Sequence, residues 1–175
     1  MIRSWGLVTS SATAMPWFGD VTTAAVALPS NSGIIPVTVA STTRYRVGDR
    51  IVLDPDLTNA DTLLVDTIPS ATVLNCRIEG EAKSHTHANG AIIQLSIACM
   101  DVIIQGVGSG EIVLGTDNTV TAVPGGSAFY ILQPVTSPAQ PAAFRLTTST
   151  DYNTVRTSDG WMIGVGTALV SAVVL

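Results

Sequence analysis

The chain has 175 residues, of which 46% are hydrophobic and only 12% charged, about half the charged share of ordinary soluble proteins. A net charge of −5 and a single lysine exclude the basic stripe that direct nucleic-acid binding requires. No apolar run approaches the roughly 18 residues that a membrane-spanning helix needs, which excludes a membrane role of that kind.

The first thirty residues carry large aromatic side chains without the alternation that is typical of strands. Trp5, Trp17 and Phe18 lie there among serine, threonine, alanine and glycine. One interpretation is an extended N-terminal arm that docks these rings on a neighbouring subunit, because large rings are favoured interface anchors. The other is that they fill the core of the chain itself. Both remain open, and the segment lacks the continuous apolar core of a secretory signal.

Short strand-like runs rich in Val, Ile, Thr and Leu follow in quick succession, separated by turn residues. Pro36 within the run 33–41 favours an edge strand, because proline cannot donate to a sheet. Pro69 and Ser70 are typical of a hairpin connection. In chain order, the expected strands lie within 33–41, 45–55, 61–68, 71–79, 91–100, 101–107, 110–116, 118–123, 127–134, 142–149, 159–166 and 167–175.

This spacing of short strands predicts an all-β fold, an antiparallel β-sandwich or β-barrel with an extended N-terminal arm. We expect an arm over 1–30, a β-module over 31–98 and a second over 99–175, or one continuous domain formed by both modules. Cys76 and Cys99 lie in apolar strand-like runs, which favours buried free thiols over a disulfide.

The stretch EAKSHTHANGAIIQL holds both histidines of the chain, His85 and His87. Side chains at i and i+2 of an extended segment point to the same face. Zinc would need at least one further ligand, and nothing in the spacing selects among Asp66, Glu79 and Glu81. Three copies of the segment meeting on a threefold axis would be another way to hold a metal.

The simpler interpretation is a polar crossing that ends in a turn, with Gly90 at positive φ and His87 packing or hydrogen bonding across it. On this interpretation the chain has no metal site and no cofactor. A cluster of carboxylates at Asp54, Asp56, Asp61 and Asp66 is likewise predicted to be a loop, because Asp beside Pro and Asn is an ordinary turn former.

Catalytic motifs are missing from the sequence. No GxSxG elbow occurs, and the glycine-rich segment 106–111 runs into a strand pattern with no lysine nearby, which argues against a nucleotide site. We therefore expect no enzymatic activity and no catalytic residues.

Residues 44–95 carry a series of short motifs. They are Val47-Gly48-Asp49, the strand-like run Leu64 to Ile68, the run Thr72 to Ile78, and His87-Ala88-Asn89-Gly90-Ala91-Ile92. In this order they resemble a β-module of virion proteins of tailed bacteriophages. In that resemblance His87 and Gly90 belong to a recurring turn.

The resemblance implies a structural protein of the phage particle. Its size suits a capsid cement or decoration protein that binds the major capsid protein, associates as a homotrimer and lies on the capsid exterior after synthesis in the host cytoplasm. The sparse charge independently favours an assembly with partners. The alternative is a tail, collar or fibre component with a carbohydrate-binding role, in which Trp161, Tyr152 or Tyr130 would stack on sugars.

Overall fold

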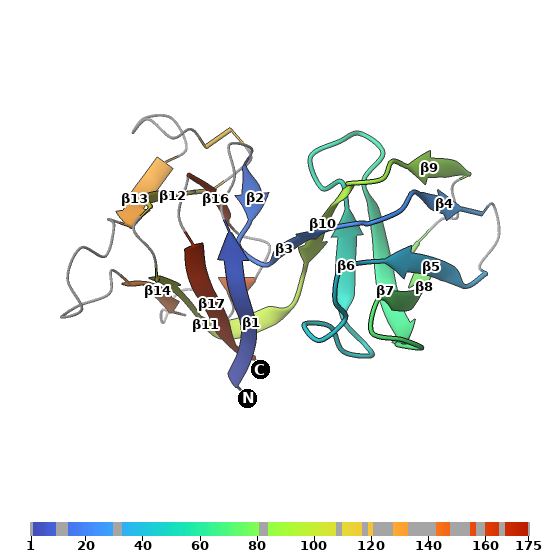
Figure 1. Ribbon diagram of the computed structural model, residues 1–175, viewed down its shortest axis with the longest axis horizontal. Coiled ribbons are helices and arrows are strands. Elements are labelled where there is room, and N and C mark those ends of the chain that lie inside the picture. Colours follow the sequence, from blue (N-terminus) through green and yellow to red (C-terminus); the bar gives the residue numbers. More distant parts are fainter. Residues whose placement is uncertain are drawn as a thin grey trace. The chain divides into compact units, whose positions relative to one another are not determined.

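The computed structural model is all-β: its described residues form strands in antiparallel sheets and contain no helix (Figure 1). The predicted fold class is therefore confirmed. No segment of the described chain forms a helix that is long and apolar enough to cross a membrane. The structure describes residues 2–9, 14–29, 33–80, 84–107, 110–116, 119–120, 128–132, 143–147, 155–156, 160–164 and 167–174.

The chain folds as two compact units. Unit 1 combines Met1–Phe18 with Ile97–Leu175, and unit 2 comprises Gly19–Ser96. The expected boundary between two β-modules, at residues 98 and 99, lies close to the observed end of unit 2. The N-terminal thirty residues divide between the two units instead of forming a separate arm.

Unit 2 is built on a six-stranded antiparallel sheet with the order β3-β10-β6-β7-β8-β5. Strand β7 shows why these residues form a sheet, since its side chains alternate between buried and partly exposed positions along the strand. The strands are β3 Gly19–Val21, β5 Ile35–Thr38, β6 Arg50–Leu53, β7 Asp61–Thr67, β8 Val73–Ile78 and β10 Ile92–Leu95.

Two features predicted from turn chemistry are confirmed in this sheet. Strand β5, which contains Pro36, lies at the end of the strand order, where a residue without a backbone N–H is tolerated. Strands β7 and β8 pair antiparallel on either side of Pro69 and Ser70, which form the expected hairpin connection.

A separate two-stranded sheet in unit 2 pairs β4 (Val26–Leu28) with β9 (His85–His87). His87 lies opposite Val26, and His85 lies opposite Leu28. Two strands alone are marginally stable in water, so this small sheet depends on contacts with the rest of unit 2.

Unit 1 contains two further antiparallel sheets. One has the order β1-β17-β11-β14, with β15 also paired to β11, and the other has the order β13-β12-β16-β2. The strands are β1 Ile2–Thr9, β2 Met15–Pro16, β11 Ala98–Gly106, β12 Ile112–Gly115, β13 Ala128–Leu132, β14 Ala143–Thr147, β15 Val155–Arg156, β16 Trp161–Gly164 and β17 Thr167–Val174.

The aromatic residues of the N-terminal segment belong to the core of unit 1. Trp5, Trp17 and Phe18 are at most 1% exposed within a single chain, and the Trp5 and Phe18 rings meet edge to face at 5.7 Å. Of the two interpretations left open by the sequence, the one in which these rings fill the core of the chain itself is confirmed, and the one that makes them interface anchors on an arm is wrong. The segment is held instead by pairing of β1 with β17, a partner far away in the sequence.

Gly160 lets the indole of Trp17 lie directly against the backbone. A Cβ added at Gly160 would lie 2.2 Å from the nearest Trp17 ring atoms, and the backbone N–H of Trp17 donates to the Gly160 carbonyl at 3.0 Å. We therefore expect Gly160→Ala to lower the free energy of unfolding of unit 1 by about 1–3 kcal/mol, as overpacked cores do. Urea denaturation followed by tryptophan fluorescence measures this, and an unchanged midpoint would contradict the close packing.

Both cysteines are free and buried, as predicted. Burial, and then the negative charge of Asp66, raises the pKa of the Cys76 thiol to about 12. At neutral pH the thiol is therefore protonated, and it packs as a small apolar side chain in the sheet of unit 2.

Candidate functional site

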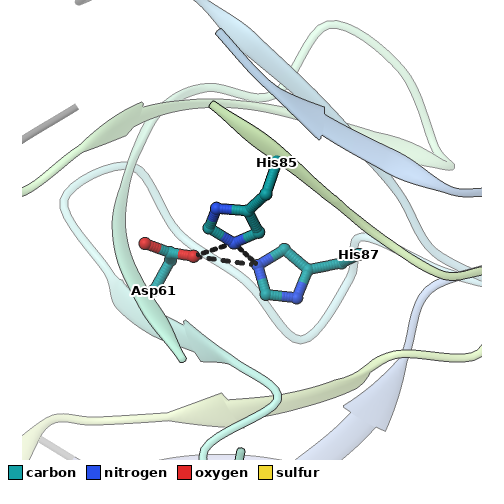
Figure 2. A group of neighbouring side chains, drawn as sticks. All are labelled: Asp61, His85 and His87. Atoms are coloured by element: carbon teal, nitrogen blue, oxygen red, sulfur yellow. Dashed lines mark hydrogen bonds and ion pairs between the residues drawn. The ribbon is translucent and has the colours of Figure 1, made fainter. Parts of the chain in front are cut away.

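The two histidines lie on strand β9 and point to the same side of it. Their rings approach each other with centroids 4.9 Å apart (Figure 2). Thr86, between them in the sequence, is exposed. The same-face prediction from the i, i+2 spacing is thus confirmed.

Asp61, the first residue of β7, joins the histidine pair (Figure 2). Its Oδ2 atom lies 2.6 Å from Nε2 of His85 and 3.0 Å from Nε2 of His87. The two Nε2 atoms are 3.2 Å apart. One carboxylate oxygen and two imidazole nitrogens therefore converge on one point from two different strands.

Asp54 contacts the opposite nitrogen of His87. Its Oδ2 atom lies 2.8 Å from His87 Nδ1, and its Oδ1 atom accepts a hydrogen bond from the Ile92 N–H at 3.0 Å. The Asp54 N–H in turn donates to the Ile92 carbonyl at 2.8 Å. Asp54 follows β6 directly and has a φ of 45°, a left-handed conformation that Asp tolerates better than most residues. Asp54 is therefore fixed at both its backbone and its side chain.

The cluster is buried on one side and reachable by solvent on the other. The His87 side chain is 0% exposed and that of Asp61 5%, whereas the His85 side chain is 23% exposed. Any ligand of this site would therefore reach it from the side of His85.

Gly90 lies in the turn between β9 and β10, as predicted. Its φ is 84°, and its N–H donates to the Thr22 carbonyl at 3.0 Å. His87 does not bond across this turn, because its side chain points from β9 toward Asp54 and Asp61 instead. The prediction of a turn role is thus correct for Gly90, while His87 belongs to the polar cluster.

The carboxylates considered as histidine partners from the sequence are engaged elsewhere or lie outside the described residues. Asp66 pairs with Arg77 at 3.1 Å, and Glu79 accepts a hydrogen bond from Arg50 Nη2 at 2.9 Å. Glu81 lies outside the described residues. The structure instead selects Asp54 and Asp61, two members of the segment that was predicted to be only a loop.

Asp61 had a detectable signal in the sequence. It lies in phase with Leu63 and Val65, which are buried on the same face of β7. A carboxylate in phase with core residues must find polar partners, because an unpaired buried charge is very costly.

His87 is poorly placed to act as a general base. Both of its ring nitrogens already lie within hydrogen-bonding distance of carboxylates, at 2.8 Å and 3.0 Å. A base needs a free nitrogen within reach of the substrate proton. The arrangement is better suited to holding a cation or to stabilising the fold.

The sugar-stacking residues proposed from the sequence have different outcomes. Trp161 is 4% exposed, and its carbonyl accepts a hydrogen bond from Trp17 Nε1 at 2.9 Å, so it cannot present a ring face to a sugar. This corrects the prediction for Trp161. Tyr152 and the side chain of Tyr130 lie outside the described residues.

Comparisons of the chain with protein-family models, curated proteins and solved structures found no match. A functional assignment is therefore based on the contacts within each unit and on the short motifs of residues 44–95.

Proposed function

We propose that the protein is a structural component of a tailed-phage particle, a cement protein that binds the major capsid protein from outside and acts as a homotrimer without catalysis. The observation that carries the proposal is the series of phage-like motifs in residues 44–95. These residues form β6, β7, β8 and β10, which are four adjacent strands of one sheet. This arrangement supports the interpretation that the motifs belong to one module.

The surface of unit 2 offers apolar side chains for such a contact. Val47 is 64% exposed and Leu57 is 56% exposed, and both lie in loops flanking β6. Charged residues precede both of them in the chain, Arg46 before Val47 and Asp56 before Leu57, so each is an apolar point of contact next to polar groups. They replace the buried N-terminal aromatic residues as the proposed points of contact with the shell.

Capsids that lack the protein provide the direct test. We expect the purified full chain to add density to the outer face of such capsids in electron micrographs. The double variant Val47→Asp/Leu57→Asp should bind less, because it places charges in an apolar contact. Asp66→Asn is a matched surface control that should bind as the wild type does. Shells that remain bare after mixing with wild-type protein would refute the capsid role.

A further inference from the structure

We propose that Asp61, His85 and His87 bind one divalent transition-metal ion, with zinc as the best match, and that Asp54 orients His87 toward it. The ion would serve as a structural cross-link within unit 2. This inference does not rest on the phage role, since all four residues belong to one unit of a single chain.

The three donor atoms have the separations that a small metal ion requires. A tetrahedral ion with bonds of about 2.0–2.1 Å holds its ligand atoms roughly 3.3–3.4 Å apart. Here the separations are 2.6, 3.0 and 3.2 Å. A position about 2.0–2.1 Å from all three atoms lies roughly 1 Å from the plane that they define. The two longer separations are within about 0.4 Å of this value, and the Asp61–His85 contact would widen by about 0.7–0.8 Å on ideal coordination.

Asp54 provides the outer contact that metal-bound histidines typically have. A ligating histidine almost always donates its second ring N–H to a carboxylate, a carbonyl or water, which fixes the ring and its tautomer. The 2.8 Å contact between His87 Nδ1 and Asp54 Oδ2 has this form. Asp54 is itself held by the Ile92 backbone, so the orientation of His87 is set before an ion arrives.

The donor set distinguishes among metals. Two imidazole nitrogens and one carboxylate suit zinc and the neighbouring first-row ions, whereas magnesium and calcium prefer oxygen ligands. Because the His85 side chain is the exposed part of the cluster, water can complete the coordination from that side. The chain thus supplies three ligands and solvent supplies the fourth.

The ion would connect two sheets of unit 2. His85 and His87 belong to the two-stranded sheet of β4 and β9, and Asp61 belongs to the six-stranded sheet. A bond from each strand to the same ion holds the small sheet against the larger one. Binding to the folded state alone raises thermal stability by mass action.

The test uses the full chain after treatment with a chelator and gel filtration. Calorimetric titration with zinc chloride should show one ion bound per chain, and the melting temperature should rise with zinc but not with the same concentration of magnesium. Cobalt should give the visible absorption of a tetrahedral or five-coordinate site with nitrogen ligands. Absence of zinc binding at micromolar concentration would overturn the proposal.

Variants assign the ligands. Asp61→Asn and His85→Ala should each lower zinc affinity at least about tenfold, and Asp54→Asn about 10- to 100-fold. Thr86→Ala, on the same strand, and Asp66→Asn, a carboxylate outside the cluster, should keep wild-type affinity. Circular dichroism of the metal-free variants checks that each is folded. Wild-type affinity in a folded His85→Ala variant would refute this ligand set, whereas bare capsids would refute only the phage role.

Discussion

Replacing Trp17 with alanine should lower the free energy of unfolding of unit 1 by about 3–5 kcal/mol, the range for large aromatic side chains in a core. Trp17 is 1% exposed, packs at 5.8 Å against the ring of Phe144 and donates from Nε1 to the Trp161 carbonyl at 2.9 Å. All three tryptophans of the chain, at positions 5, 17 and 161, belong to unit 1. Urea denaturation followed by the fluorescence of the two that remain therefore reports on this unit.

Two further variants separate the contributions of Trp17. Trp17→Phe keeps a ring but removes the N–H donor, so its cost should be smaller, with about 1–3 kcal/mol coming from the unpaired carbonyl. Leu169→Ala, at a position that is 37% exposed, should lower stability by only about 1 kcal/mol. A Trp17→Ala variant as stable as Leu169→Ala would show that Trp17 does not form part of the core.

The second large effect is expected in unit 2. His87→Ala should destabilise metal-free unit 2 by about 3–5 kcal/mol, because it leaves the carboxylates of Asp54 and Asp61 without a shared partner and opens a cavity. The His87 side chain is 0% exposed and contacts both carboxylates. Thermal melting followed by circular dichroism, in the presence of chelator, measures the effect without a contribution from bound metal.

Thr86→Ala is the matched control for this variant. Thr86 lies between the two histidines on β9, and its side chain is exposed. Its replacement should change stability by less than about 0.5 kcal/mol. Equal melting temperatures for His87→Ala and Thr86→Ala would mean that the buried polar cluster contributes nothing to the fold. Added zinc should no longer stabilise the His87→Ala variant, whereas it should still stabilise Thr86→Ala.

The sheet of unit 2 was largely predictable because its signals are local. Alternation around Leu63 and Val65, the proline in β5 and the Pro69-Ser70 turn each determine nearby structure. The strands of the first thirty residues were missed because their partners are distant in sequence. Ile2 pairs with Val173, and only that pairing places Trp5 in a core. Short-range patterns carry no information about such a contact.

The candidate site was predictable in part. The i, i+2 spacing correctly placed His85 and His87 on one face. Asp61 was predicted to belong to a loop, although its position in phase with buried Leu63 and Val65 could have indicated a buried carboxylate. Asp54 could not be found in this way. Its contact with His87 depends on a left-handed backbone conformation and on hydrogen bonds to Ile92, neither of which leaves a pattern in the sequence.

The pairing of β1 with β17 has a consequence for the order of folding during synthesis. Unit 1 is discontinuous, since residues 1–18 precede the whole of unit 2 and their partners in β17 follow it in the chain. Unit 2 is a continuous segment, and it emerges from the ribosome before β11 and β17 do. Domains generally fold as units during synthesis. Unit 2 can therefore fold before unit 1, and β1, which contains Trp5, stays unpaired until β17 emerges.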